Sequence, residues 1–431
     1  MTILDDARAV IENGPVCDSC LGRVFADRSF GLTNEQRGNA LRTAVALAAD
    51  EPYEPTAVSE CWVCEGLCAT FDEWAERAAE TVADIEFDTY QVGTRTPPLV
   101  EENELLLRES AGLPEDAGEQ FKSEFNREVG KRIGRLTETE VDFGRPHVMF
   151  TLDLEGDAVE TRNHSTFVYG RYRKLERDIP QTKWPCSECN ETGYIRGDPC
   201  HVCAGSGYRY PESVEQLAAP PLLEAMDGEE TTFHGAGRED VDALMLGTGR
   251  PFVMEISNPK VRHVDMAALE EKINEQADGK IEVEGLRACT YEMVERVKEH
   301  DASKTYRMDV KFAHPVTVED LQAAISKLEG ATIEQYTPKR VDHRRANLTR
   351  ERTVYDIEGE LVDEYHADLT IHGAGGLYIK ELVSGDDGRT EPSLTGLLGV
   401  NAVVTALDVV AVEGEDEPFE REEFFLDGES A

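Results

Sequence analysis

The chain has 431 residues, 40% of them apolar and 7% aromatic, which is enough to bury a sizeable core in each of two or three domains. It carries 87 Asp and Glu against 44 Lys and Arg, a formal net charge of −43 at pH 7. No apolar run is long enough to span a bilayer, and the N-terminus lacks a basic stretch followed by an apolar one, so we expect a soluble, cytoplasmic protein with no membrane partner.

The excess of acidic residues bears on the possible partners of the chain. In dilute buffer such a charge repels nucleic acid and destabilises a compact chain. Near 1 M salt the Debye length falls to about 3 Å, so both effects largely vanish. The composition therefore favours a halophilic protein and does not exclude an RNA partner. An acidic mesophilic protein that binds basic partners is the alternative.

The first half of the chain mixes helix and strand patterns. Apolar residues recur at helical spacing over residues 37–50, which predicts a helix. Residues 148–156 and 165–174 alternate as strands do. Residues 213–226 predict a helix that two adjacent prolines interrupt.

The second half alternates helices and strands. Apolar side chains fall on every second residue from Tyr306 to Phe312, as expected for a strand with one buried face. The last segment, 413–431, has nine acidic residues and one Arg, and we expect a solvated tail. The pattern predicts an α+β fold with a mixed, mainly antiparallel sheet. The expected helices are 265–277 and 318–330, and the expected strands are 304–312, 331–338, 367–375 and 401–413.

Eight of the ten cysteines fall in four C-x-x-C pairs. One such turn presents two thiolates, and two turns complete a tetrahedral zinc site, which in a reducing cytoplasm is favoured over disulfides. Redox chemistry is the alternative for the later pairs, and Cys68 is interpreted as a core residue. We predict a structural zinc in a knuckle region at 1–80, held by Cys17, Cys20, Cys61 and Cys64. A possible second metal is predicted in an insert at 184–210, held by Cys186, Cys189, Cys200 and Cys203.

Two stretches reverse the overall negative charge, each with six basic residues against two acidic ones. Arginine suits bidentate contacts with phosphate and stacking on bases, so both islands are predicted to contact RNA. An ordinary solvated face is the alternative. The first basic island, 162–183, contains Arg162, Arg171, Arg173, Lys174, Arg177 and Lys183; the second, 339–352, contains Lys339, Arg340, Arg344, Arg345, Arg350 and Arg352.

A glycine-bounded segment, 235–249, holds the best candidate for a catalytic carboxylate. Glycine lets a ligand approach the backbone closely, and an arginine beside an aspartate favours the ionised, nucleophilic form. A plain turn with a salt bridge is the alternative. The segment contains Arg238, Glu239, Asp240 and Asp242 between the pairs Gly235/Gly237 and Gly247/Gly249.

Three short motifs, in the same order along the chain, resemble those of pseudouridine synthases. Gly237-Arg238-Glu239-Asp240 is similar to their Gly-Arg-x-Asp motif, Lys304-Thr305-Tyr306 to the strand with the active-site Tyr, and GLYIKEL (376–382) to the third motif. Longer stretches extend the likeness over nearly the whole chain except the acidic tail. CDSCLGRVF, GRYRKLERDIPQTKWPC, GREDVDALMLGTGRPFVMEI, QYTPKRVDHRRA and GLYIKELVSGDDGRTEPSL together resemble the archaeal tRNA pseudouridine synthases that modify positions 54 and 55 of the TΨC arm.

This resemblance implies a fold, a reaction and site residues. It implies a THUMP-type RNA-binding region at 81–183 and a catalytic domain at 211–412, with tRNA as substrate and neither an organic cofactor nor an obligate protein partner. Asp240 would be the nucleophile, Tyr306 would stack on the target base, and Tyr378 would be a second substrate contact. Arg238 and Lys380 would be active-site cations. The four N-terminal cysteines match the zinc knuckles of the family.

Two other functions stay open. A THUMP-bearing enzyme of another chemistry, such as a methyltransferase or a thiolation enzyme, is disfavoured because the sequence has no glycine-rich cofactor loop. A zinc-ribbon and THUMP RNA-binding module without catalysis is the second. Tyr306 and Tyr378 also have a plainer interpretation as core aromatics, and Lys380 as a surface residue.

Overall fold

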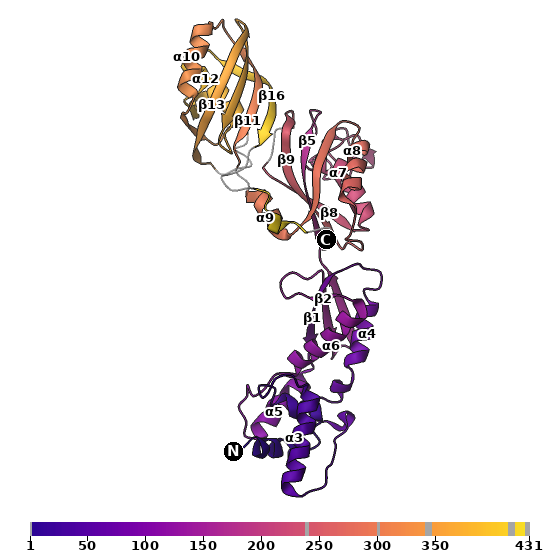
Figure 1. Cartoon of the computed structure of the whole chain (residues 1–431). Helices are drawn as coiled ribbons and strands as arrows, with labels where there is room; N and C mark the ends of the chain where they lie inside the picture. The colour runs from indigo at the N-terminus through magenta and orange to yellow at the C-terminus, as the bar shows by residue number, and fades with distance from the viewer. Residues whose placement is uncertain (1, 238–240, 300–301, 341–346, 413–418, 427–431) are drawn as a thin grey trace. The chain divides into compact units, whose positions relative to one another are not determined.

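The computed structural model describes residues 2–431 except 238–240, 300–301, 341–346, 413–418 and 427–431 (Figure 1). The chain divides into two compact units, which we describe separately. Unit 1 comprises Met1–His164 with Pro259–Val261, and unit 2 comprises Ser165–Asn258 with Arg262–Ala431. Among the described residues, no helix combines the length and the apolar character needed to cross a membrane.

Unit 1 combines helices with a four-stranded sheet of order β2-β1-β3-β4, in which β1 is parallel to both its neighbours. Its helices are α1 Ile3–Ile11, α2 Asp18–Arg23, α3 Asn34–Ala49, α4 Phe71–Glu80, α5 Pro98–Ser110 and α6 Phe121–Thr137. Its strands are β1 Thr89–Arg95, β2 Glu140–Val141, β3 Val148–Asp153 and β4 Ala158–Asn163.

Helices α2 and α3 pack closely because glycine stands at their crossing. A Cβ on Gly22 would overlap the Asn34 carbonyl, and one on Gly38 would overlap the backbone of Asp18. The predicted helix over 37–50 is confirmed, although it begins earlier. Thr33 caps its N-terminus in a capping box with Gln36, a local signal that periodicity alone does not detect.

Unit 2 is built on a ten-stranded sheet of order β10-β5-β9-β16-β11-β14-β13-β12-β15, with β8 paired to β9. All pairs in it are antiparallel except β9 with β16, which confirms the expected mixed, mainly antiparallel sheet. The strands are β5 Thr166–Lys174, β8 Glu230–Gly235, β9 Leu244–Ser257, β10 Ile281–Cys289, β11 Lys304–Phe312, β12 Thr332–Tyr336, β13 Thr349–Asp363, β14 His366–Gly373, β15 Thr390–Glu391 and β16 Ala402–Val412, with β6 Tyr194–Ile195 and β7 Asp198–Pro199 forming a separate ribbon. The helices are α7 Val214–Ala225, α8 Met266–Gln276, α9 Tyr291–Glu299, α10 Val318–Leu328, α11 Ile379–Ser384 and α12 Leu394–Leu398.

Both faces of the β5 and β9 part of this sheet are buried. Alternate residues of a strand point to opposite faces. Val168 and Phe252 belong to one buried cluster, while Tyr169 and Val253 belong to another. In Figure 1, α7 and α8 lie on one side of these strands and α9 on the other. These strands therefore form the middle layer of three.

The interruption predicted for the helix over 213–226 is wrong. Helix α7 continues through Pro220 and Pro221. Each proline removes a backbone donor, which usually breaks a helix. Here the face of the helix that carries Val214, Ala218 and Leu222 is fully buried, so tertiary packing outweighs the local penalty.

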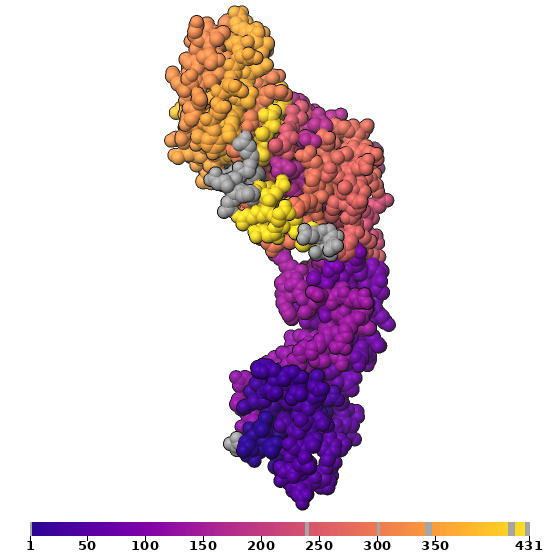
Figure 2. Space-filling view, viewed as in Figure 1, coloured from indigo at the N-terminus to yellow at the C-terminus, as the bar shows by residue number. Residues whose placement is uncertain are grey.

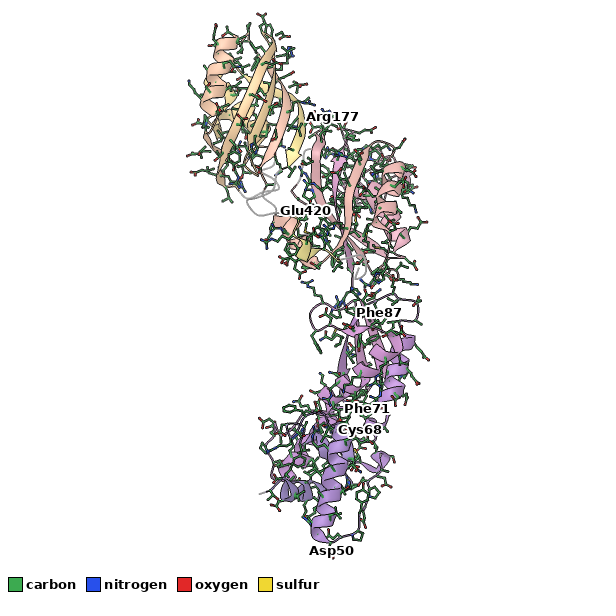
Figure 3. All side chains as sticks on the ribbon, in the orientation of Figure 1. Asp50, Cys68, Phe71, Phe87, Arg177 and Glu420 are labelled. Carbon is green, nitrogen blue, oxygen red and sulfur yellow. The ribbon has the colours of Figure 1, made fainter. Side chains whose placement is uncertain are left out.

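The prediction of a solvated C-terminal tail is also wrong for residues 419–426, which pack against unit 2 (yellow in Figure 2). Phe419 and Phe425 are buried. The backbone of Phe425 forms an isolated antiparallel β-bridge with Cys289, the last residue of the edge strand β10. Tyr169 donates a hydrogen bond to Glu420 (2.6 Å; Glu420 is labelled in Figure 3). The high charge of this segment obscured its aromatic residues, which supply the apolar surface that docks.

We expect Phe425→Ala to lower the free energy of unfolding of unit 2 by about 3 kcal/mol, because the substitution leaves a cavity under the docked segment. Urea titration in 2 M KCl measures the change. Glu423→Ala is the control, since its exposed ion pair with Arg421 should contribute under about 1 kcal/mol. Equal stability of the two variants would contradict a structural role for the segment.

Candidate active site and metal centres

The glycine-bounded segment runs from the last residue of β8 into β9, and residues 236–243 form the connection between the two strands. Arg238, Glu239 and Asp240 lie outside the described residues. The structure resumes at Val241 and Asp242, two residues before β9 begins. We therefore describe the residues that hold Val241 and Asp242, which follow the candidate nucleophile in the sequence.

The register of three strands relates the start of β9 to Tyr306. Met245 of β9 and Tyr306 of β11 both lie opposite Val409 of β16, one on each side. Neighbouring strands are about 4.8 Å apart and opposed residues point to the same face, so the two backbones are about 10 Å apart. Tyr306 is half-buried and packs against two apolar clusters, one around Met245 and one around Met308.

Helix α11 carries the two residues of the third motif. Tyr378 is its N-cap residue, and its backbone N–H and carbonyl both bond to the buried side chain of Gln335 (2.8 and 2.9 Å). Lys380 forms an ion pair with Asp242 (Nζ to Oδ2, 3.1 Å). The third motif thus contacts Asp242, which follows Asp240 by two residues in the sequence.

Asp408 lies beside the candidate site, and the sequence did not single it out. It is only 8% exposed in β16, and its Oδ1 accepts from Arg177 (2.7 Å) and from the backbone N–H of Leu244 (3.4 Å). Arg307 lies 3.7 Å from its other oxygen. A single acidic residue in a mainly apolar strand was the signal in the sequence that could have identified Asp408. Such a carboxylate, when buried, requires a cation or hydrogen-bond donors beside it.

The side chains of the first basic island differ in exposure: Arg162, Arg177 and Lys183 are exposed, while Arg171 and Arg173 are half-buried. Lys174 is fully buried. Arg171 donates to the carbonyls of Thr248 and Gly249 (2.7 and 3.1 Å). Arg173 pairs with carboxylates of β10. Much of this charge holds the backbone around the candidate site.

Two glycines of the segment also act differently from the prediction. Gly247 has φ +59°, and a Cβ there would overlap the carbonyl of Val410. Gly249 has φ +68° and lies against the carbonyl of Tyr172. These glycines let β9 approach its neighbouring strands, so the close contact they permit is with the protein itself.

The second basic island lies partly outside the description, since 341–346 and hence Arg344 and Arg345 are not described. Lys339 pairs with Asp387. Arg340 pairs with the buried Glu381 of α11 (2.6 Å). Arg340 therefore ties this island to the helix that carries Lys380.

In unit 1, the predicted knuckle cysteines come together in a buried cluster. Sγ of Cys17 lies 3.9 Å from Sγ of Cys64, and Sγ of Cys61 lies 3.6 Å from Sγ of Cys20. Zinc–sulfur bonds of about 2.3 Å in a tetrahedron place sulfurs about 3.8 Å apart. The donor set and its spacing therefore fit a structural zinc.

Cys68 joins this cluster, contrary to its interpretation as a simple core residue. It forms a group with Cys17, Cys20 and Cys64 whose sulfurs all lie within 4.8 Å of one another. Its Sγ also accepts a hydrogen bond from Nη1 of the buried Arg23 (3.8 Å; Cys68 is labelled in Figure 3). This close group of four contains Cys68 in the place predicted for Cys61, whose Sγ lies near that of Cys20.

The cysteines of the insert form a second buried group. Its two knuckles repeat each other: Cys186 N–H donates to the Gly207 carbonyl and Cys200 N–H to that of Gly193. Sulfur distances of 3.9 Å (Cys186 to Cys200) and 3.7 Å (Cys189 to Cys203) again match a tetrahedral edge. Burial raises the pKa of Cys203, but backbone N–H donors and the neighbouring thiols outweigh it and lower the pKa to about 6. This group also fits a metal ion.

Comparison with known families matches most of the chain. Residues 167–413 match the model described as "Pus10, C-terminal", and residues 74–153 match "Pus10 THUMP domain, archaeal". The fold class expected from the sequence is thereby confirmed.

Similar curated proteins extend the match over the full length. A "tRNA pseudouridine synthase Pus10" of Halorubrum lacusprofundi is 67% identical over 99% of this chain and 100% of its own. A protein of the same name from Methanothrix thermoacetophila is 41% identical over 96% of this chain and 95% of its own. Among solved structures, a Cbf5-Nop10-Gar1 complex is 17% identical with a TM-score of 0.29, covering 46% of this chain and 45% of that chain.

Proposed function

Because the chain belongs to the Pus10 family of tRNA pseudouridine synthases, we propose that it isomerises the uridines at positions 54 and 55 of the TΨC arm of tRNA. Membership favours catalysis over the RNA-binding module without activity. The observation that carries the assignment to this site is the ion pair between Lys380 and Asp242. It joins the third motif to the connection that contains Asp240.

The reaction needs no net oxidant and no external cofactor. The bond between C1′ and N1 of the uridine breaks, the uracil rotates, and a bond forms between C1′ and C5. C5 loses a proton and N1 gains one, so the atoms balance. The ionised carboxylate of Asp240 serves as the covalent partner of the intermediate.

The target base must leave the folded arm to reach this carboxylate. We propose that Tyr306, half-buried on the same sheet face as Met245, stacks on the extruded base; the strand register supports this role. Stacking of this kind contributes roughly 1–3 kcal/mol per base. Tyr378 at the start of α11 supplies a second contact, and Lys380 and Arg238 supply positive charge.

Mapping of pseudouridine on an unmodified tRNA transcript tests the positions. Wild-type protein in 2–3 M KCl should convert both uridines, and a transcript with cytidine at one position should be converted at the other only. Modification outside the TΨC arm would overturn the assignment of the substrate site.

Unit 1 would bind the tRNA, since it contains all of the residues matched by the THUMP model. We assign unit 1 to RNA binding. The knuckle cysteines would stabilise the packing of its helices. The acidity of the chain suits a salt-rich cytoplasm, and the relative that is 67% identical comes from Halorubrum lacusprofundi. No obligate protein partner is part of the proposal.

For the first metal site we propose zinc held by Cys17, Cys20, Cys61 and Cys64. Both sulfur pairs near the tetrahedral edge length belong to this set. Arg23 does not distinguish the candidates, because it donates to Sγ of Cys20 (3.4 Å) as well as to Sγ of Cys68 (3.8 Å). The zinc would tie the N-terminal knuckle to the rest of unit 1 without taking part in the reaction. The insert cysteines would hold a second zinc.

We expect Cys61→Ser to reduce the zinc content from two ions per chain to one. Cys68→Ser should retain both ions, because it removes a thiol that lies beside the coordination sphere. Atomic absorption on the purified full-length variants measures the content. The reverse result, with zinc lost from Cys68→Ser only, would make Cys68 the fourth ligand.

A further inference from the structure

We propose that Lys174 and Arg177 are positioning residues for the nucleophile, acting through the backbone that follows Asp240. This inference rests on the proposed function. The two residues belong to the first basic island, which the sequence had suggested as an RNA contact. They hold the carbonyls of Val241 and Asp242, the two residues immediately after the nucleophile.

Lys174 is the last residue of β5, and its side chain is fully buried. Its Nζ donates to the carbonyls of Ile179 (2.9 Å) and Val241 (3.0 Å). The N–H of Asp178 donates to the same Val241 carbonyl (3.0 Å). A buried ammonium is costly unless it is hydrogen-bonded, so these bonds fix Val241 firmly. The ammonium cannot reach a phosphate from this position.

Arg177 holds the next residue from the surface side (Figure 3). Its Nη1 donates to the carbonyls of Asp242 (2.7 Å) and Leu407 (3.2 Å), and its Nη2 to Asp408 (2.7 Å). Asp408 in turn accepts from the N–H of Leu244. The chain that follows the nucleophile is therefore held at Val241 by β5, at Asp242 by the turn after β5, and at Leu244 by β16.

A covalent nucleophile must meet the reacting carbon within a few tenths of an ångström. A displacement of about 1 Å can reduce a rate by about 100-fold without changing what binds. Loss of either clamp residue should therefore lower kcat and leave KM for tRNA nearly unchanged. A residue that contacts RNA would raise KM instead.

The decisive experiment compares Lys174→Met with Lys272→Met in single- and multiple-turnover assays on tRNA. Lys272 is exposed on α8, where it pairs with Glu224, and its loss removes the same charge. We expect Lys174→Met to lose at least about 100-fold in kcat with KM changed less than about 3-fold. Lys272→Met should match the wild type in both. Wild-type kcat in folded Lys174→Met, with or without a raised KM, would overturn the proposal.

Arg177→Met provides the second variant, since Arg177 is about one-third exposed and its loss should leave unit 2 folded. It should lower kcat by at least about 10-fold, and Arg177→Lys should restore part of the loss. If Lys174→Met fails to fold, the Arg177 pair decides: unchanged kcat in Arg177→Met overturns the proposal. Activity retained in Asp240→Ala would instead overturn the proposed nucleophile, so the two failures are distinct.

Discussion

Asp240→Ala should abolish pseudouridine formation, with a fall in rate of at least about 10⁴-fold, while tRNA still binds. The carboxylate is the covalent partner of the intermediate, and removing a nucleophile costs nearly all of the chemical acceleration. Binding survives because the THUMP-matching unit and the stacking residue Tyr306 are unchanged. Single-turnover conversion of an unmodified transcript in 2–3 M KCl, with a gel-shift assay beside it, measures both.

Asp242→Ala is the control for this experiment. Asp242 is the other aspartate of the connection, but its carboxylate is engaged by Lys380, and its backbone is held by Arg177. We expect its loss to lower the rate by about 10-fold only, through release of Lys380. Conversion that persists in Asp240→Ala and disappears in Asp242→Ala would assign the nucleophile to Asp242. Binding without conversion by the wild type would favour the non-catalytic module.

Local patterns predicted the strands around the site well. The alternation from Tyr306 to Phe312 identified β11, and the apolar run at 401–413 identified β16. Which strands become neighbours was not predictable, because the parallel contact of β9 with β16 joins residues about 160 positions apart. This contact places the start of β9, which follows the candidate catalytic segment, near Tyr306.

Charge runs were the least reliable signal. A local count cannot distinguish an arginine that faces solvent from one that donates to a carbonyl, and Lys174 is fully buried. The same limit applied to the tail, where nine acidic residues concealed the buried Phe419 and Phe425. The cysteine pairs were predictive because metal coordination requires both the residue type and the spacing.

Arg23→Met should destabilise unit 1 by about 3–5 kcal/mol, the largest effect we expect on stability. Arg23 is 1% exposed and pairs with Glu104 of α5 (3.0 Å) and Glu124 of α6 (2.9 Å). Breaking a buried pair leaves a charge without its partner in a medium of low dielectric. Glu104 would still have Arg108 as an ion-pair partner at 3.6 Å, so most of the destabilisation comes from the buried carboxylate of Glu124, which loses Arg23.

The effect of this substitution should depend on pH. Burial already raises the pKa of Glu124 above its ordinary value, although Arg23 opposes the shift. Without Arg23 the pKa of the folded state rises further above that of the unfolded state. Stability is then highest below the unfolded pKa and falls as pH rises through the folded pKa. The deficit of Arg23→Met should therefore be smaller at pH 5 than at pH 8.

Urea titration in 2 M KCl, followed by tryptophan fluorescence, measures the deficit because Trp62 and Trp74 both lie in unit 1. Arg127→Met is the matched control: Arg127 is 41% exposed and pairs with Glu119, so its loss should cost under about 1 kcal/mol. High salt screens that surface pair and leaves the buried one intact. A deficit that matched the control, or that grew toward pH 5, would mean that Arg23 does not hold the three helices through its charge.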